Sequence, residues 1–169
     1  MVSDDLVSEA MAEFRAVDAS DCCHGHEKDI VRQFVASIGA GYADHRLAVD
    51  ASDTVVCEMA FKFGRADIVI FHVGGSATVV EVKDGTHGYN HVVSGIGQAG
   101  LYAAQLAMTR GAVREVRKAL LWSSVGNAHL DAVIEAVCLQ ANVLPLSWPA
   151  LSKIMAVKVA VANVFAKVA

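Results

Sequence analysis

Three short runs rich in β-branched and aromatic residues, between residues 47 and 83, constrain the fold of this chain most. The runs read DTVVCEMAF, RADIVIFHV and ATVVEVK, and they are separated by residues 62–64 and 74–76, which contain glycine. Runs of this length between such breaks are typical of β-strands joined by tight turns. The sequence therefore predicts three consecutive strands arranged as a meander.

A long helix is expected after these strands, from about Tyr89 to Arg110, because the segment is rich in alanine and closes on Gly111. A long crossover helix after a meander usually returns the chain to a parallel strand. The next segments fit that order. RKALLWSS is expected to be a strand, NAHLDAVIEAVCLQA a helix that begins near Asn127, and NVLPLSW a short last strand. The predicted fold class is α/β, with a mixed central sheet flanked by helices.

Amphipathic helices are also expected on both sides of this core. Apolar residues recur at helical spacing in residues 4–17 and again from about Glu27 to Ile38. The apolar tail, 148–169, contains three lysines, each of which would cost about 2.5–3.5 kcal/mol near a bilayer centre. We expect a terminal helix that packs on the domain or forms a dimer or protein contact, with no membrane anchor.

Length and composition indicate one globular domain over residues 1–169. With 14 basic and 18 acidic residues the formal net charge is −4, which excludes a global positive field that would attract nucleic acid. A nucleic-acid site would have to be a local patch. The N-terminus is acidic and amphipathic and the chain has only 4 cysteines, so a reducing, cytoplasmic location is expected.

Two charged residues interrupt the most apolar run. Glu81 and Lys83 are two apart in ATVVEVK and so share one face of the predicted strand, and Asp67 lies in the preceding strand. By themselves Glu81 and Lys83 would form an ion pair at an exposed sheet edge. With a second acid on the adjacent strand, they instead favour a divalent-cation site in which a lysine acts on water or phosphate.

The spacing of Asp67 and Glu81-Val82-Lys83 resembles the D…ExK signature of the PD-(D/E)XK nuclease superfamily, with Ala66 where the pattern has proline. The resemblance implies a restriction-endonuclease-like αβββαβ core, here about 25–123, with residues 124–169 as a C-terminal α/β extension. GHEKDIVRQFV resembles the first core helix of Holliday-junction resolvases, and Gln98 and Tyr102 match the QxxxY motif of RecB-like nucleases.

The resemblance implies a Mg²⁺-dependent nuclease, with Mn²⁺ as a substitute and DNA as partner and substrate. Asp67, Glu81, the main-chain carbonyl of Val82 and Glu27 would be metal ligands, and Lys83 would be catalytic. Gln98 and Tyr102, one helical turn apart, would steady the substrate strand.

Several assignments stay open at this point. The third ligand is Glu27, His24 or His26, and Glu58 is either a further acid of the site or a solvent-facing strand residue. Residues expected to bind substrate are His91, Arg65 and Lys62. A basic group forms either a phosphate-binding patch or a solvated face, and consists of Arg110, Arg114, Arg117 and Lys118.

A second functional class is also compatible with the sequence. The acidic net charge and the apolar tail suit a catalytically silent or regulatory protein that keeps the nuclease fold and works through protein contacts. A buried set of two acids and a lysine opposes this hypothesis, because such a set has a cost in stability.

Overall fold

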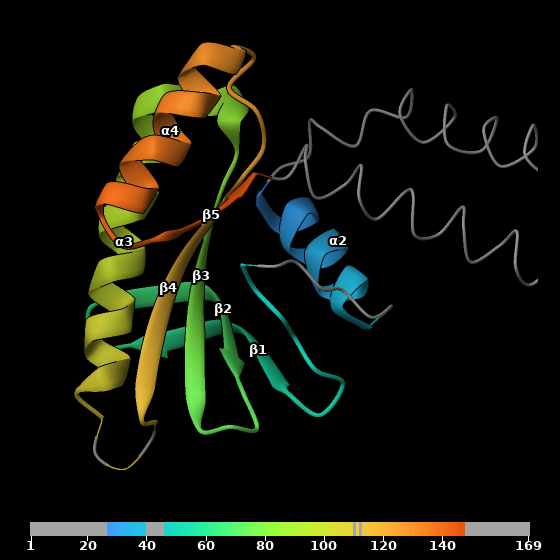
Figure 1. Ribbon diagram of the computed structural model, residues 1–169, viewed down its shortest axis with the longest axis vertical. Helices are drawn as coiled ribbons and strands as arrows, with labels where there is room; N and C mark the ends of the chain where they lie inside the picture. Colours follow the sequence, from blue (N-terminus) through green and yellow to red (C-terminus); the bar gives the residue numbers. More distant parts are fainter. Residues whose placement is uncertain (1–26, 40–45, 110, 112, 148–169) are drawn as a thin grey trace, which may run out of the picture.

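The computed structural model describes residues 27–39, 46–109, 111 and 113–147, and Figure 1 shows how their helices and strands are arranged. The predicted helix at 4–17, the apolar tail, His24, His26 and Arg110 lie outside these residues. The elements in chain order are α2 (Glu27–Gly39), β1 (Thr54–Phe61), β2 (Gly64–Phe71), β3 (Ser76–Lys83), η1 (Gly85–His87), α3 (Tyr89–Ala107), β4 (Glu115–Trp122), α4 (Ala128–Gln140) and β5 (Leu144–Ser147).

The strands form one mixed sheet in the order β1-β2-β3-β4-β5. The first three strands pair antiparallel, as the meander predicts, and β4 and β5 pair parallel. The helix α3 connects β3 to β4, and α4 connects β4 to β5. The prediction of an α/β protein with a mixed sheet, in which the long helix returns the chain to a parallel strand, is confirmed.

Helices cover both faces of the sheet, α2 on one side and α3 with α4 on the other (Figure 1). The alternation of β3 explains this arrangement. Val80 and Val82 pack with Phe34 of α2, whereas Val79 packs with Leu106 of α3. Each fully buried side chain of this size stabilises the fold by about 1.5–3 kcal/mol. Since Glu81 and Lys83 alternate with Val80 and Val82, they point toward α3.

Several element ends differ from the prediction, and two of them have a visible cause. The helix α3 ends at Ala107 and not at Arg110, because its last turn tightens: Thr109 N donates to Leu106 O at 3.0 Å. The strand β4 ends at Trp122, two residues earlier than predicted. Its expected last residues, Ser123 and Ser124, use their hydroxyls in other contacts: Ser123 Oγ accepts from Gly85 N after β3, and Ser124 Oγ donates to Asp131 Oδ2 of α4.

None of the helices in the part of the chain that the structure describes has the length and apolar character needed to span a membrane.

Candidate active site

Glu81 and Lys83 lie at the C-terminal end of β3, in the middle of the sheet. Their exposed fractions are 3% and 6%, and β3 pairs with β2 on one side and β4 on the other. The interpretation of these residues as a pair at an exposed sheet edge is therefore wrong. They are buried charges on a central strand, where unpaired charge is costly.

Lys83 and Glu81 contact each other directly. Lys83 Nζ donates a hydrogen bond to Glu81 Oε1 at 2.8 Å. The second oxygen of the carboxylate, Glu81 Oε2, is buried and has no hydrogen-bond partner among the described residues. A buried carboxylate oxygen without a donor loses its hydration without compensation. The side chain is therefore held in a geometry that leaves one acceptor free.

Asp67 approaches this pair where two strands separate. The pairing of β2 with β3 ends at Ile68↔Val80, one residue short of Asp67. At that point the Asp67 carboxylate replaces the backbone as acceptor, since Val82 N donates to Asp67 Oδ2 at 2.7 Å. The hydrogen bond fixes Asp67 against the strand that carries Glu81 and Lys83.

The pKa values show how strongly the acids interact. Burial and then the negative charge of Asp67 raise the pKa of Glu81 from 4.5 to about 7, against the opposing effect of Lys83. Burial also raises the pKa of Asp67, which the hydrogen bond from Val82 and the charge of Lys83 offset only in part. The arrangement therefore places two carboxylates where a positive charge would be favourable.

Lys83 remains charged in this environment. Burial lowers the pKa of its ammonium group, but the hydrogen bond and charge of Glu81 outweigh burial and hold the pKa above its ordinary value. While it contacts Glu81, Lys83 is therefore a cation and hydrogen-bond donor and not a base.

Glu27 begins α2 and reaches the same end of the sheet. Its Oε1 lies 2.7 Å from His91 Nε2 and 3.9 Å from Lys83 Nζ, and it accepts a hydrogen bond of 3.4 Å from Asp84 N. The His91 ring contacts the His87 ring edge to face, with centroids 5.0 Å apart. The structure therefore brings the predicted residues Glu27 and His91 together with Lys83, at the start of two helices.

Gly95 of α3 makes room for Lys83. A Cβ atom at Gly95 would lie 2.9 Å from Cγ of Lys83 and 2.6 Å from Cδ1 of Leu120. The helix α3 can therefore cross Lys83 closely only with glycine at this position. A buried lysine followed by a helix with spaced glycines is the sequence feature that could have indicated this contact.

Gln98 and Tyr102 point toward the sheet. Tyr102 is 7% exposed and stacks on Phe61 with ring centroids 5.9 Å apart, and a Cβ atom at Gly64 would lie 2.7 Å from its hydroxyl. Gln98 Oε1 is buried without a hydrogen-bond partner among the described residues. Their predicted contact with a substrate strand remains a prediction.

A pocket of about 350 Å³ lies beside Asp67 and contains several predicted residues. Arg65 lines it and forms an ion pair with Glu58 at 3.1 Å, and Glu27 lines the opposite side from α2. Lys62 lies in the β1–β2 turn, 5.1 Å from the centroid of the Phe63 ring. The pocket gives solutes a path to Asp67, and its charged rim combines acidic and basic groups.

Glu58 has an unusual backbone. Its φ is +54°, and the β1–β2 pairing omits it between Cys57↔Ile68 and Met59↔Ala66, so it lies opposite Asp67. A left-handed residue inside a strand bends the strand and interrupts its ladder. Both neighbouring ladders are thus interrupted at Asp67, which was not predicted from the sequence.

The donors of this site suit a hard divalent cation in part. Carboxylates are the ligands that Mg²⁺ prefers. A cation would give the unpartnered Glu81 Oε2 a ligand and would reduce the charge repulsion between Asp67 and Glu81. Within residues 27–39, 46–109, 111 and 113–147, no group of three or more His, Cys, Asp or Glu side chains is arranged to hold a metal ion. The described site therefore offers a pair of carboxylates, which agrees with the habit of Mg²⁺ of retaining several water ligands.

No family model, no curated protein and no solved structure matches this chain. The assignment of a function therefore rests on the sequence and on the geometry of these residues.

Proposed function

We propose that this protein is a metal-dependent DNA nuclease of the PD-(D/E)XK type that hydrolyses phosphodiester bonds. The observation that carries the proposal is the carboxylate of Glu81, buried beside Asp67 and Lys83 with Oε2 unpartnered among the described residues. Such an arrangement has a cost in folding, and a ligand at the site would offset that cost.

The order of elements supports the same assignment. The helix α2, the strands β1, β2 and β3, the helix α3 and the strand β4 follow the αβββαβ order of the restriction-endonuclease-like core. The acids lie where β2 and β3 separate, and a substrate could approach Asp67 from the pocket beside α2.

Asp67 and Glu81 would hold the cation, with Glu27 as a further anion near Lys83. A bound Mg²⁺ lowers the pKa of a coordinated water and neutralises charge on a phosphate. Lys83, as an ammonium group, donates hydrogen bonds to the attacking water or to the phosphate oxygens as negative charge builds on them. Arg65, which lines the pocket, would contact a neighbouring phosphate.

A cleavage assay tests the proposal. Labelled linear, single-stranded, circular and junction DNAs are incubated with Mg²⁺, Mn²⁺ or EDTA. We expect cleavage that depends on the metal and falls by roughly 100-fold or more in Asp67→Asn, Glu81→Gln and Lys83→Met. Asn is chosen at position 67 because it keeps an acceptor for Val82 N.

Glu115→Gln is the matched control, because Glu115 is exposed and begins β4 at the other end of the sheet. Unchanged cleavage in all three active-site variants would refute the mechanism.

The direct Lys83–Glu81 contact favours a second candidate, a nuclease-fold protein without catalysis that acts through protein contacts. In it the lysine would neutralise Glu81 permanently. Calorimetric titration with Mn²⁺ separates the two candidates. Binding that is lost in Asp67→Asn and Glu81→Gln supports the nuclease, and the absence of such binding supports the second candidate.

A further inference from the structure

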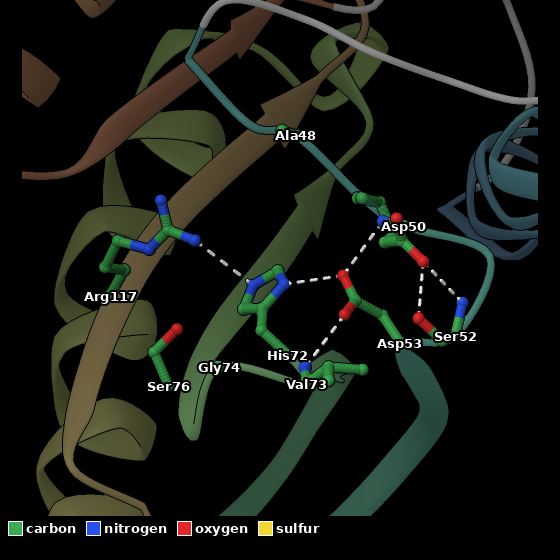
Figure 2. Close-up of a pocket in the computed structure, with 10 residues that line it drawn as sticks. Ala48, Asp50, Ser52, Asp53, His72, Val73, Gly74, Ser76 and Arg117 are labelled. Atoms are coloured by element: carbon green, nitrogen blue, oxygen red, sulfur yellow. Dashed lines mark hydrogen bonds and ion pairs between the residues drawn. The ribbon is translucent and has the colours of Figure 1, made fainter.

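A second polar pocket, of about 460 Å³, lies on the α2 face of the sheet at the end of β2 and the start of β3 (Figure 2). Ser76 begins β3 and Lys83 ends it, so this pocket and the acidic site occupy opposite ends of that strand. At about 3.3 Å per residue the two ends of the strand are roughly 20 Å apart. Its properties are independent of the proposed nuclease function.

Asp53 and His72 form a buried pair at the base of this pocket. The side chains are 4% and 10% exposed, and Asp53 Oδ2 lies 2.7 Å from His72 Nδ1. Two backbone groups also donate to Asp53: Asp50 N donates to Oδ2 and Val73 N to Oδ1, each at 3.0 Å. Figure 2 shows these contacts converging on the carboxylate.

Asp53 is consequently an anion that fixes the imidazole. Burial raises the pKa of Asp53, but the hydrogen bonds from Asp50, Val73 and His72 outweigh burial and leave the pKa below its ordinary value. A carboxylate can only accept, so Nδ1 of His72 must carry a proton. In the neutral imidazole, Nε2 is therefore an acceptor, and it lies away from Asp53.

Two donors share that acceptor. Thr78 Oγ1 lies 2.9 Å from His72 Nε2, and Arg117 Nη2 donates to the same nitrogen at 3.2 Å. Thr78 is fully buried, whereas Arg117 is partly exposed and lines the pocket. Among the described residues, His72 is the hydrogen-bond partner of the guanidinium, so most of its N–H groups are available to the pocket.

We propose that this pocket binds a tetrahedral oxyanion through Arg117, and that binding draws a proton onto His72. The ligand chemistry is that of a phosphate group, carried either by a small phosphorylated molecule or by a nucleic-acid backbone. A guanidinium binds such groups through parallel N–H donors, and Ser76 lines the same wall.

The coupling to a proton follows from the hydrogen bonds of His72. Once Nε2 is protonated it donates to Thr78 and no longer accepts from Arg117, so the guanidinium is released toward the pocket. Two cations then face the pocket, and an anion between them offsets their repulsion. The other charged groups around the imidazole are Asp53, which accepts three hydrogen bonds, and Asp50 at the rim, which accepts from Ser52. Arg114 lies beside Gly75 in the adjacent turn.

Sulfate is the probe that tests this inference, because it does not titrate between roughly pH 5 and 8 and any proton taken up belongs to the protein. Calorimetry is run in two buffers of different ionisation enthalpy. We expect saturable binding that is at least about threefold tighter at about pH 6 than at about pH 8, with proton uptake. This measurement needs no variant, so it holds even if substitutions disturb folding.

Variants then assign the residues. Arg117→Gln should weaken sulfate binding by about tenfold or more, and His72→Gln should retain binding but lose the pH dependence. Arg32→Gln is the matched control, since Arg32 is an exposed arginine of α2 that does not line this pocket. It should bind as the unmodified protein does.

Phosphate, a nucleoside monophosphate and a short single-stranded oligonucleotide identify the source of the group. Competition by the monophosphate supports a small ligand. Competition by the oligonucleotide alone supports a nucleic-acid backbone. No saturable binding to any probe, equal binding by Arg117→Gln, or an unchanged pH dependence in His72→Gln would overturn the proposal.

Discussion

The side chain of Lys83 passes directly beneath Gly95, where a Cβ atom would lie 2.9 Å from Cγ and 3.2 Å from Cε of the lysine. The helix α3 and the strand β3 are therefore packed around the aliphatic stem of a charged residue. Any side chain at position 95 must displace Lys83 or Leu120, and displacement of Lys83 would move its ammonium group away from Glu81.

Gly95→Ala is the first prediction. We expect a loss of about 1–3 kcal/mol in the free energy of unfolding from overpacking, together with reduced cleavage, because Lys83 is shifted. Chemical denaturation and the cleavage assay measure the two effects. Gly97→Ala and Gly100→Ala on the same helix are controls, since a Cβ there meets nothing within 4 Å. These should stabilise α3 by about 0.5–1 kcal/mol, and equal effects at all three positions would contradict the packing argument.

The raised pKa of Glu81 makes stability depend on pH. The folded protein holds a proton on Glu81 up to about pH 7, whereas the unfolded chain releases it near 4.5. The folded state thus binds more protons between these values, and the contribution of Glu81 to stability is lost as pH rises through them. Glu81→Gln cannot titrate and lacks this slope.

The measurement is the free energy of unfolding of both proteins in EDTA across that pH range. Relative to Glu81→Gln, the unmodified protein should lose up to about 3 kcal/mol between about pH 4.5 and 7. Mn²⁺ should reverse much of this loss, since a cation favours the ionised carboxylate. A difference between the two proteins that stays constant with pH would contradict the assigned environment of Glu81.

The contact between Glu27 and His91 predicts different effects for two conservative substitutions. Glu27→Gln removes the anion 3.9 Å from Lys83 and should lower cleavage by about 10-fold to 100-fold. His91→Gln should have a smaller effect, because an amide can still donate to Glu27. Lys28→Gln, which lines the same pocket from α2, is the control. A larger loss in His91→Gln would indicate that the imidazole itself touches the metal or the substrate.

Gly64 and Tyr102 give a prediction for stability. Gly64 has φ +116°, and its missing side chain accommodates the Tyr102 hydroxyl. We expect Gly64→Ala to destabilise the fold by about 1–3 kcal/mol, from backbone strain and from the clash. Gly74→Ala in the next turn should change the free energy of unfolding by less than about 0.5 kcal/mol, because its surroundings are open. Thermal unfolding compares the two, and a Gly64→Ala protein as stable as the parent would be inconsistent with the observed packing.

The periodic parts of the chain were predictable because one rule acts over many residues. The alternation in ATVVEVK placed Glu81 and Lys83 on one face, and the length of the 89–107 segment implied a parallel β4. The proximity of Asp67 to that strand also followed from hairpin register.

Other features depend on contacts between distant residues and left little trace in the local pattern. The place of Gly95 above Lys83 depends on how α3 crosses the sheet. The Asp53–His72–Arg117 network joins three segments separated by 19 and 45 residues, so no local motif contains it. In the sequence, the only local sign of this network is His72, a histidine at the end of an apolar strand.

The bend at Glu58 has a consequence for how the sheet meets other chains. Among the described strands, β1 and β5 form the two borders of the sheet. A long, flat border strand is a template onto which a second molecule can add its own strand. The left-handed residue in the middle of β1 breaks that template, and Pro145, which has no N–H, blunts the four-residue β5. The feature that opens the sheet around Asp67 thus also makes β1 a poor template for strand addition.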